Sequence, residues 1–245
     1  MVLIKELNNL YRQSVMKISV VIPTWNEERS IGSLVEFIRT NGGDLIAEII
    51  VSDACSEDDT AISAKDAGAI VVGNDTKCRA AQMNKGAALA TGDILYFIHA
   101  DVKLIHTFAR DIIESVKSGY DAGCYRYVFD SSSQMLRVNG YCTRFEGIMC
   151  RGGDQTLFVT RIAFQEVKGF NTFYEIMEDY DFILRLRKKY RFRIIPKSIK
   201  VSARKYETNS WIKVQLANLS VFVMFFLKVS PQKMKSFYSR ALKYR

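Results

Sequence analysis

The first hundred residues alternate between short apolar runs rich in β-branched side chains and longer amphipathic segments. Strands are expected within residues 17–26, 48–60, 69–73 and 93–101, and helices over 28–40, from about residue 58, and over 78–92. Strands separated by helices form parallel sheets with right-handed crossovers. We therefore predict an α/β fold with a Rossmann-like, mostly parallel sheet flanked by helices, whose binding crevice lies at the carboxyl ends of the strands.

The second half of the chain is less regular. Strands are expected within residues 120–130, 151–164 and 191–196, and helices over 178–190 and 211–229. Acidic residues begin the 178–190 segment and basic residues end it, which suits the helix dipole on structural grounds alone. We divide the chain into an N-terminal extension (1–16), one α/β domain (17–210) and an apolar, basic helical tail (211–245).

Charge is unevenly distributed along the chain. From Asp179 onward there are 17 basic and 3 acidic residues, a net charge of +14, whereas the first 178 residues carry −5. The basic region indicates either a solvated helical surface or contact with phosphate or an anionic membrane. Nucleic acid is not expected, because no recognised binding motif accompanies the charge.

Cysteine usage and the N-terminus bear on the compartment. The five cysteines are scattered, without a close C-x-x-C pair, so they indicate neither a disulfide framework nor a zinc site. The first residues have mixed charge and no apolar stretch long enough for a secretory signal. We expect a cytoplasmic protein, either free or associated with the inner face of the membrane.

Polar side chains follow three of the predicted parallel strands. Thr24 and Glu27 follow the first strand, Asp53 the second and Asp101 the fourth. Because parallel strands share one edge, these groups should converge, and Arg79 at a helix start adds a cation suited to a phosphate or a ring carbonyl. A carboxylate there either faces water or holds Mg²⁺ or Mn²⁺, which take oxygen ligands. No G-x-G-x-x-G follows the first strand, so a dinucleotide-binding fold is disfavoured.

A family resemblance is carried by five segments in order: VVIPTWNEERSI, SDACSEDDT, CRAAQMNKGAALATGDILYFIHAD, GGDQTLFVTRIAFQEVKGF and MEDYDFILRLRKK. Together they resemble glycosyltransferase family 2, with its GT-A fold, and within it a compact subgroup with His-Ala-Asp in place of Asp-x-Asp. The resemblance runs from about Ile18 to residues 229–231. It implies an inverting, metal-assisted transfer of a sugar from a nucleotide-sugar donor, by default a UDP-sugar, to an acceptor hydroxyl.

The resemblance also implies which residues hold the donor. Thr24, Glu27 and Asp53 match the residues that hold the nucleoside, and Arg79 matches the arginine that approaches the base or the diphosphate. Arg204 and Lys205 follow a predicted strand in the basic region. Either one of them approaches the diphosphate from the acceptor side, or both lie in a surface turn.

The remaining motif residues bear on the metal, the base and the acceptor. Asp101 matches the aspartate that meets Mn²⁺ or Mg²⁺ between the two phosphates. Glu178 and Asp179 match the Glu-Asp motif that supplies the general base, a role we assign to Asp179. Asp154 lies where family members line the acceptor pocket. The acceptor itself is not predicted, although a lipid-linked one would suit a tail that meets a membrane.

Two departures from the family pattern stand out. His99 replaces the first acid of Asp-x-Asp, so one negative charge is lost, and its imidazole either hydrogen-bonds ribose or ligates the metal. That exchange favours a weaker metal requirement, or Mn²⁺ over Mg²⁺, since imidazole suits softer ions. Ala54 and Cys55 stand where the family prefers glycine, which puts the shape of that loop in question rather than its role.

Two functions other than sugar transfer are compatible with parts of this pattern. A nucleotidyltransferase should show a glycine-rich loop bearing Lys or Arg after the first strand, and this chain has none. A membrane-surface adaptor of the same fold with weakened catalysis is favoured by His99 and disfavoured by the retained Asp101, Glu178 and Asp179.

The tail has two open interpretations. Its uninterrupted apolar part, Val221–Leu227, is far shorter than the ~20 residues that a membrane span requires. Either the helix packs against the domain or pairs in a homodimer, or it makes a peripheral contact with an anionic leaflet.

Overall fold

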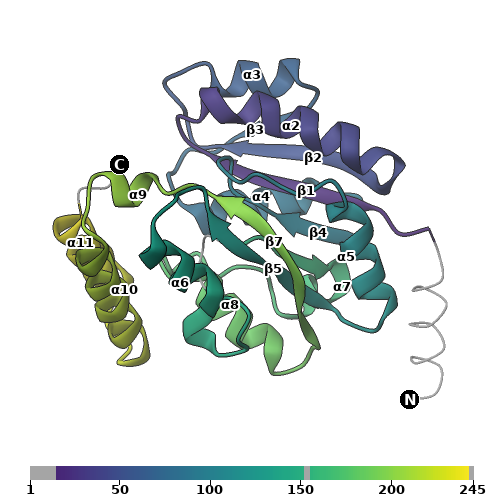
Figure 1. Ribbon diagram of the computed structural model, residues 1–245. Coiled ribbons are helices and arrows are strands. Elements are labelled where there is room, and N and C mark those ends of the chain that lie inside the picture. Colours follow the sequence, from purple (N-terminus) through teal and green to yellow (C-terminus); the bar gives the residue numbers. More distant parts are fainter. Residues whose placement is uncertain (1–14, 152–154, 243–245) are drawn as a thin grey trace.

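The computed structural model describes residues 15–151 and 155–242 (Figure 1). The candidate acceptor residue Asp154 and most of the expected N-terminal extension therefore lie outside the described residues.

Within the described residues, one sheet has the strand order β3-β2-β1-β4-β6-β5-β7. Strands β1 to β4 are parallel, β6 runs antiparallel between β4 and β5, and β7 is parallel to β5. The strands are β1 (Ile18–Thr24), β2 (Ile46–Asp53), β3 (Ile70–Gly73), β4 (Ile94–Phe97), β5 (Ala122–Phe129), β6 (Leu157–Thr160) and β7 (Phe192–Val201). The predicted α/β fold with a mostly parallel sheet is confirmed.

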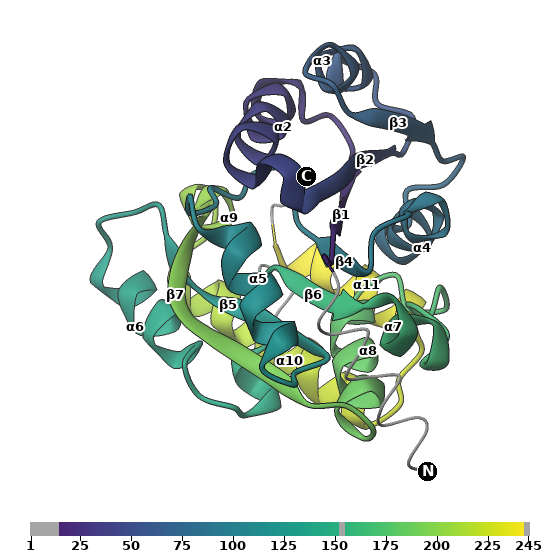
Figure 2. The same cartoon turned by 90° about the vertical axis from the view of Figure 1, so that its right-hand side faces the viewer.

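Helices cover both faces of the sheet (Figure 2). The helices are α2 (Glu28–Gly42), α3 (Thr60–Asp66), α4 (Arg79–Leu89), α5 (Phe108–Lys117), α6 (Gln134–Cys142), α7 (Arg161–Glu166), α8 (Glu178–Arg187), α9 (Arg204–Glu207), α10 (Trp211–Phe226) and α11 (Pro231–Ala241), with 3₁₀ turns at Gly43–Leu45 and Ile148–Cys150. One core cluster joins the sheet to α2 and α5, and a second joins it to α4, α7 and α8.

Strand β1 shows why the central strands are apolar throughout. Ile18, Val20 and Ile22 belong to the core on one side of the sheet, and Val21 belongs to the core on the other. All four are fully buried. A parallel strand covered on both faces needs apolar residues at successive positions rather than at alternate ones.

Some strand boundaries differ from the prediction. Strand β4 ends at Phe97, so His99 and Asp101 lie in the loop beyond it, although the apolar run predicted a strand to residue 101. Strand β7 continues to Val201, past the predicted end at residue 196, because β5 supplies pairing partners as far as Phe129.

The C-terminal helices α10 and α11 pack against each other beside the domain (Figure 1). Phe222 and Phe225 of α10 meet Tyr180 and Tyr174, with ring centroids 5.8 and 5.4 Å apart. Helix α10 ends at Phe226, three residues before the predicted end. In the part of the chain that the structure describes, every helix is too short or too polar to cross a bilayer.

Candidate functional site

The ends of β1 and β2 form the first part of the site. Thr24 and Asp53 are register partners at the carboxyl ends of these strands, and the Thr24 hydroxyl donates to Asp53 Oδ1 at 2.9 Å. Asp53 is buried, and it also accepts from the Ser56 amide at 2.9 Å and from the Ser56 hydroxyl at 2.5 Å. The structure thus brings Thr24 and Asp53 together, as expected for groups at the shared edge of parallel strands.

Unusual backbone conformations occur in the loops around these residues. Asn26 and Cys55 have φ values of 54° and 51°, and Met177, just before Glu178, has 69°. Left-handed conformations of residues other than glycine cost energy and cluster at functional sites. The loop after β2 therefore keeps a conformation that suits glycine, although Cys55 stands there.

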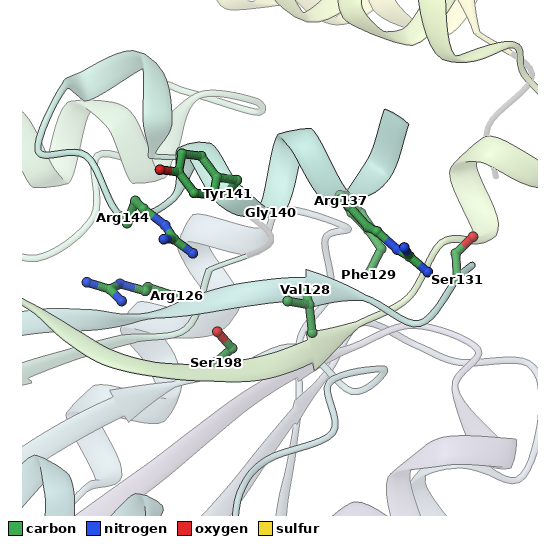
Figure 3. A pocket seen from close by; sticks show the side chains of 9 residues that line it. All are labelled: Arg126, Val128, Phe129, Ser131, Arg137, Gly140, Tyr141, Arg144 and Ser198. Carbon is green, nitrogen blue, oxygen red and sulfur yellow. The ribbon is translucent and has the colours of Figure 1, made fainter. Parts of the chain in front are cut away.

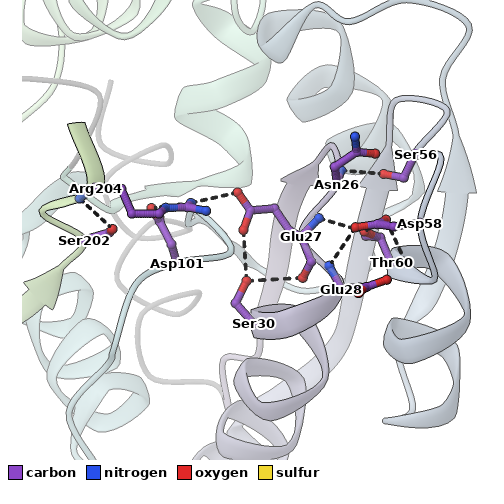
Figure 4. A network of polar contacts seen from close by, with 10 residues as sticks. All are labelled: Asn26, Glu27, Glu28, Ser30, Ser56, Asp58, Thr60, Asp101, Ser202 and Arg204. Atoms are coloured by element: carbon purple, nitrogen blue, oxygen red, sulfur yellow. Dashed lines mark hydrogen bonds and ion pairs between the residues drawn. The ribbon is translucent and has the colours of Figure 1, made fainter. Parts of the chain in front are cut away.

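Arg204 joins two of the predicted site residues (Figure 4). Its Nη2 donates to Glu27 Oε1 and to Asp101 Oδ2, both at 2.9 Å, across sequence separations of 177 and 103 residues. Partial burial opposes the charged form of Arg204, but hydrogen bonds and charge from the two carboxylates raise its pKa overall. The Ser30 hydroxyl donates a hydrogen bond to the other carboxylate oxygen of Glu27, Oε2, at 3.0 Å. The loop after β4 and helix α9 are thereby tied to the end of β1.

A second ion pair joins the first residues of two helices. Arg79 begins α4, Glu178 begins α8, and Arg79 Nη1 lies 3.3 Å from Glu178 Oε1. The side chain of Glu178 is 3% exposed and that of Arg79 is 42% exposed. Asp179, next in the chain, is only half-buried. The two neighbouring acids therefore differ in environment: Glu178 is enclosed and ion-paired, whereas Asp179 is partly open to solvent.

The residues predicted to hold a metal are few. Asp101 is partly exposed, and the half-buried His99 lies two residues before it on the same loop. Among the described residues, no three His, Cys, Asp or Glu side chains group closely enough to enclose a metal ion. Such a site fits Mg²⁺ or Mn²⁺ coordinated by one or two protein side chains together with substrate phosphates. It does not fit a metal ion whose ligands all come from the protein.

Sequence reasoning missed two groups near these loops. Gln82, buried one turn after Arg79, donates from Nε2 to the carbonyls of Thr24 and Ser52 at 2.8 and 2.7 Å. A polar residue on the buried face of a helix was the available signal. Trp25 is 37% exposed, and Lys77 Nζ lies 3.8 Å from its ring centroid. An exposed indole next to Thr24 offers a flat surface at the site.

Comparison with known proteins decides the family. The sequence profile described as Glycosyl transferase family 2 matches residues 19–189, more than two thirds of the chain. The chain belongs to glycosyl transferase family 2. The matched region includes nearly every predicted site residue and excludes Arg204.

Two glucosyl-3-phosphoglycerate synthases are similar in sequence to part of this chain. Glucosyl-3-phosphoglycerate synthase of Mycolicibacterium smegmatis is 41% identical over 93 residues, which is 35% of this chain and 31% of that protein. The synthase of Petrotoga mobilis is 32% identical over 139 residues, which is 52% of this chain and 43% of that protein. The aligned segments thus span less than half the length of either relative.

Two solved structures share the fold. A mannosyltransferase of Pyrobaculum calidifontis, in complex with GDP-Man and Mn²⁺, superposes with a TM-score of 0.67 at 16% identity, covering 93% of this chain and 69% of that one. Glucosyl-3-phosphoglycerate synthase of Mycobacterium tuberculosis, in complex with Mn²⁺, UDP and glucosyl-3-phosphoglycerate, gives a TM-score of 0.58 at 20% identity over 79% of this chain and 73% of that one. At these identities the likeness concerns the fold.

Proposed function

We propose that the chain is an inverting glycosyltransferase that moves a sugar from a nucleotide-sugar donor to an acceptor hydroxyl. The observation that carries this proposal is the convergence, at one edge of a family 2 domain, of the Thr24–Asp53 pair with the carboxylates of Glu27 and Asp101. Open α/β sheets bind their ligands at this edge.

The donor nucleoside occupies the loops after β1 and β2. Asp53 is held by Thr24 and Ser56, so its carboxylate orders both loops. The exposed Trp25 ring supplies a surface on which a base stacks. The diphosphate lies toward Arg204 and Arg79, whose guanidinium groups suit phosphate oxygens.

The metal site lies at Asp101, with His99 as the second group. A divalent cation bound there, Mn²⁺ or Mg²⁺, stabilises the charge that develops on the departing nucleoside diphosphate. Arg204 contacts both Glu27 and Asp101, and it keeps positive charge at this position. Arg204 stays close enough to assist with the same charge when the donor is bound.

Asp179 acts as the general base. An acceptor hydroxyl is a poor nucleophile, and a carboxylate within hydrogen-bond reach accelerates its attack by ~10² to 10⁴. Glu178 is enclosed and ion-paired to Arg79, so it positions the start of α8, whereas the half-buried Asp179 is partly open to solvent, from which an acceptor enters. A single displacement at the anomeric carbon inverts its configuration.

The nucleobase of the sugar donor is to be determined by experiment. The structural neighbours bind UDP in one case and GDP-Man in the other, each with Mn²⁺. A thermal-shift screen of the full chain with UDP-, GDP- and dTDP-sugars, with and without Mn²⁺, tests the proposal. A donor at 100 times its Kd should stabilise the protein by about 2.7 kcal/mol. No stabilisation by any of these donors under either condition would sink the proposal, whereas a nucleoside triphosphate that alone stabilises the protein would favour nucleotidyl transfer.

We also propose that α10 makes a peripheral contact with an anionic membrane. Its exposed apolar residues repeat at spacings of three or four: Ile212, Leu216, Leu219, Val223 and Phe226, with Leu227 adjoining. This spacing forms one continuous stripe along the helix. Exposed cations lie next to the stripe in sequence at Lys213 and Lys228, and α11 adds Lys233 and Arg240, whereas Lys235 is ion-paired with Glu175. Each cation near an anionic surface contributes about 1 kcal/mol, which suits reversible binding close to a lipid-linked acceptor.

Co-sedimentation with vesicles tests this contact. We expect binding to phosphatidylserine vesicles at low salt, weaker binding at high salt, and none to phosphatidylcholine. Leu216→Gln with Val223→Gln should abolish binding, whereas Ile62→Gln, at an equally exposed apolar residue on α3, should not. Binding that is absent, or indifferent to lipid charge, contradicts the proposal, and concentration-dependent self-association lost in the same variant would identify the stripe as a homodimer surface.

A further inference from the structure

A pocket of about 150 Å³ lies between α6 and the neighbouring strands β5 and β7, at one side of the sheet (Figure 3). It shares no residue with the candidate transferase site. The described residues that line it are Arg126, Val128, Phe129, Ser131, Arg137, Gly140, Tyr141, Arg144 and Ser198. Helix α6 lies close to β5 here because Gly140 lacks a side chain: a Cβ atom would lie 2.9 Å from the Tyr127 carbonyl oxygen.

Three arginines give this pocket its charge. The guanidinium groups of Arg126 and Arg144 lie at one end of the pocket, and Arg137 reaches toward Ser131 at the other (Figure 3). None of the lining residues is acidic. No ion pair joins any of the three guanidinium groups to another described residue. Like charges gathered in this way call for a negative partner.

Two of the arginines are already oriented. The Arg144 guanidinium stacks on the Tyr141 ring at 3.8 Å from its centroid, which limits its freedom without neutralising its charge. Arg126 projects from β5 opposite Ser198 of β7, and its Nε is buried without a hydrogen-bond partner in the described structure. A buried donor left unpaired is costly, and a bound anion would supply the missing acceptor.

We propose that this pocket binds the phosphoryl group of a phosphomonoester. Arginine guanidinium groups donate paired hydrogen bonds to tetrahedral oxyanions, and Arg126 and Arg144 lie together with the Ser198 hydroxyl nearby. A phosphomonoester carries a charge of about −1.5 to −2 near neutral pH, so it neutralises the positive charge of several guanidinium groups more completely than a single carboxylate does. The phosphoryl group belongs either to a soluble metabolite or to a lipid headgroup, and both present the same chemistry.

The direct test is arginine side-chain NMR on the full chain. Inorganic phosphate is titrated at constant ionic strength against chloride, and the Nε–Hε signals are followed, with Arg126→Lys used to assign the signal of Arg126. We expect that signal to shift saturably with phosphate and not with chloride. Absence of a saturable shift in the wild-type protein overturns the proposal, whatever the donor screen gives.

Variants localise the binding. Arg144→Ala removes an exposed side chain, so folding should persist, and it should weaken phosphate binding about tenfold, as expected for a lost charge-assisted hydrogen bond. Arg137→Ala, at the other end of the pocket, should weaken it less. Arg110→Ala, at an exposed arginine of α5 outside the pocket, is the matched control and should change nothing. Equal weakening in the control would mean general charge attraction and would refute a built site.

Two further arms separate the sources of the phosphoryl group. Glycerol 3-phosphate serves as a soluble phosphomonoester, and phosphatidic acid vesicles, compared with phosphatidylserine vesicles of equal charge, serve as a lipid one. A soluble source predicts that glycerol 3-phosphate shifts the Arg126 signal at least as strongly as phosphate does. A lipid source predicts a preference for phosphatidic acid that Arg144→Ala removes. If neither ligand depends on Arg144, the proposal is wrong.

Discussion

The pairing of Arg79 with Glu178 allows a quantitative test of the site, because 99 residues separate the two in sequence. We consider Arg79→Met, Glu178→Gln and the double variant. Arg79→Met leaves a carboxylate that is 3% exposed without this cation 3.3 Å away. Breaking a fully buried pair costs about 3–5 kcal/mol, but water screens this one because the Arg79 side chain is 42% exposed. We therefore expect Arg79→Met to lower the free energy of unfolding by about 1–3 kcal/mol.

The double-mutant cycle isolates the contact itself. Glu178→Gln removes the buried charge, so Arg79→Met should cost less in that background, with a coupling free energy of about 1 kcal/mol. Urea denaturation of the four proteins measures each free energy of unfolding. Arg110→Met, at an exposed arginine of α5, controls for loss of a surface charge and should show no coupling to Glu178→Gln. A coupling of zero for Arg79 would refute the placement of α4 against the start of α8.

Three further predictions follow from the structure. Asp179→Asn should retain donor binding and lose about 10² to 10⁴ in transfer rate, and loss of donor affinity instead would remove it as the base. Gly123→Ala should destabilise the fold by about 1–3 kcal/mol, because a Cβ would clash with a main-chain oxygen of β7; an unchanged melting temperature would contradict that packing. Burial opposes ionisation of Glu48, but hydrogen bonds from Ser19 and Thr91 lower its pKa below 4.5 overall. Wild-type protein should therefore exceed Glu48→Gln in stability above about pH 4.5 and lose that advantage as the pH falls further, and a difference independent of pH would argue against it.

Much of the fold could be predicted from the local pattern of apolar and polar residues. The apolar run of β1 has buried residues at every position, which is typical of a strand between two layers of helices, and Thr24 and Asp53 meet at the shared edge of parallel strands, as predicted. Both features depend on neighbours within a few tens of residues, where periodicity and turn signals are informative.

The features that were missed depend on long-range contacts. Strand β6 runs antiparallel between β4 and β5, and its short apolar sequence carries no mark of direction. The sequence does not decide whether Arg204 lies in a surface turn or contacts a diphosphate, because its two partners lie more than a hundred residues away. The end of β4 at Phe97 was hidden by the apolar residue Ile98, which is buried beyond the last strand pair.

Nucleotide binding by Asp101→Asn tests the central claim most directly. Trp25 lies beside the proposed nucleoside loop, so its fluorescence reports binding of UDP or GDP, with and without Mn²⁺. In the wild-type protein Mn²⁺ should tighten binding. Asp101→Asn should lose that enhancement and all transfer activity while its melting temperature stays nearly unchanged, since a partly exposed ion pair contributes only about 0–1 kcal/mol. Asp130→Asn, at an exposed acid paired with Lys103, is the control and should behave as wild type. If Asp101→Asn keeps both the Mn²⁺ enhancement and the activity, Asp101 is a solvent-facing loop residue and the proposed metal site is wrong.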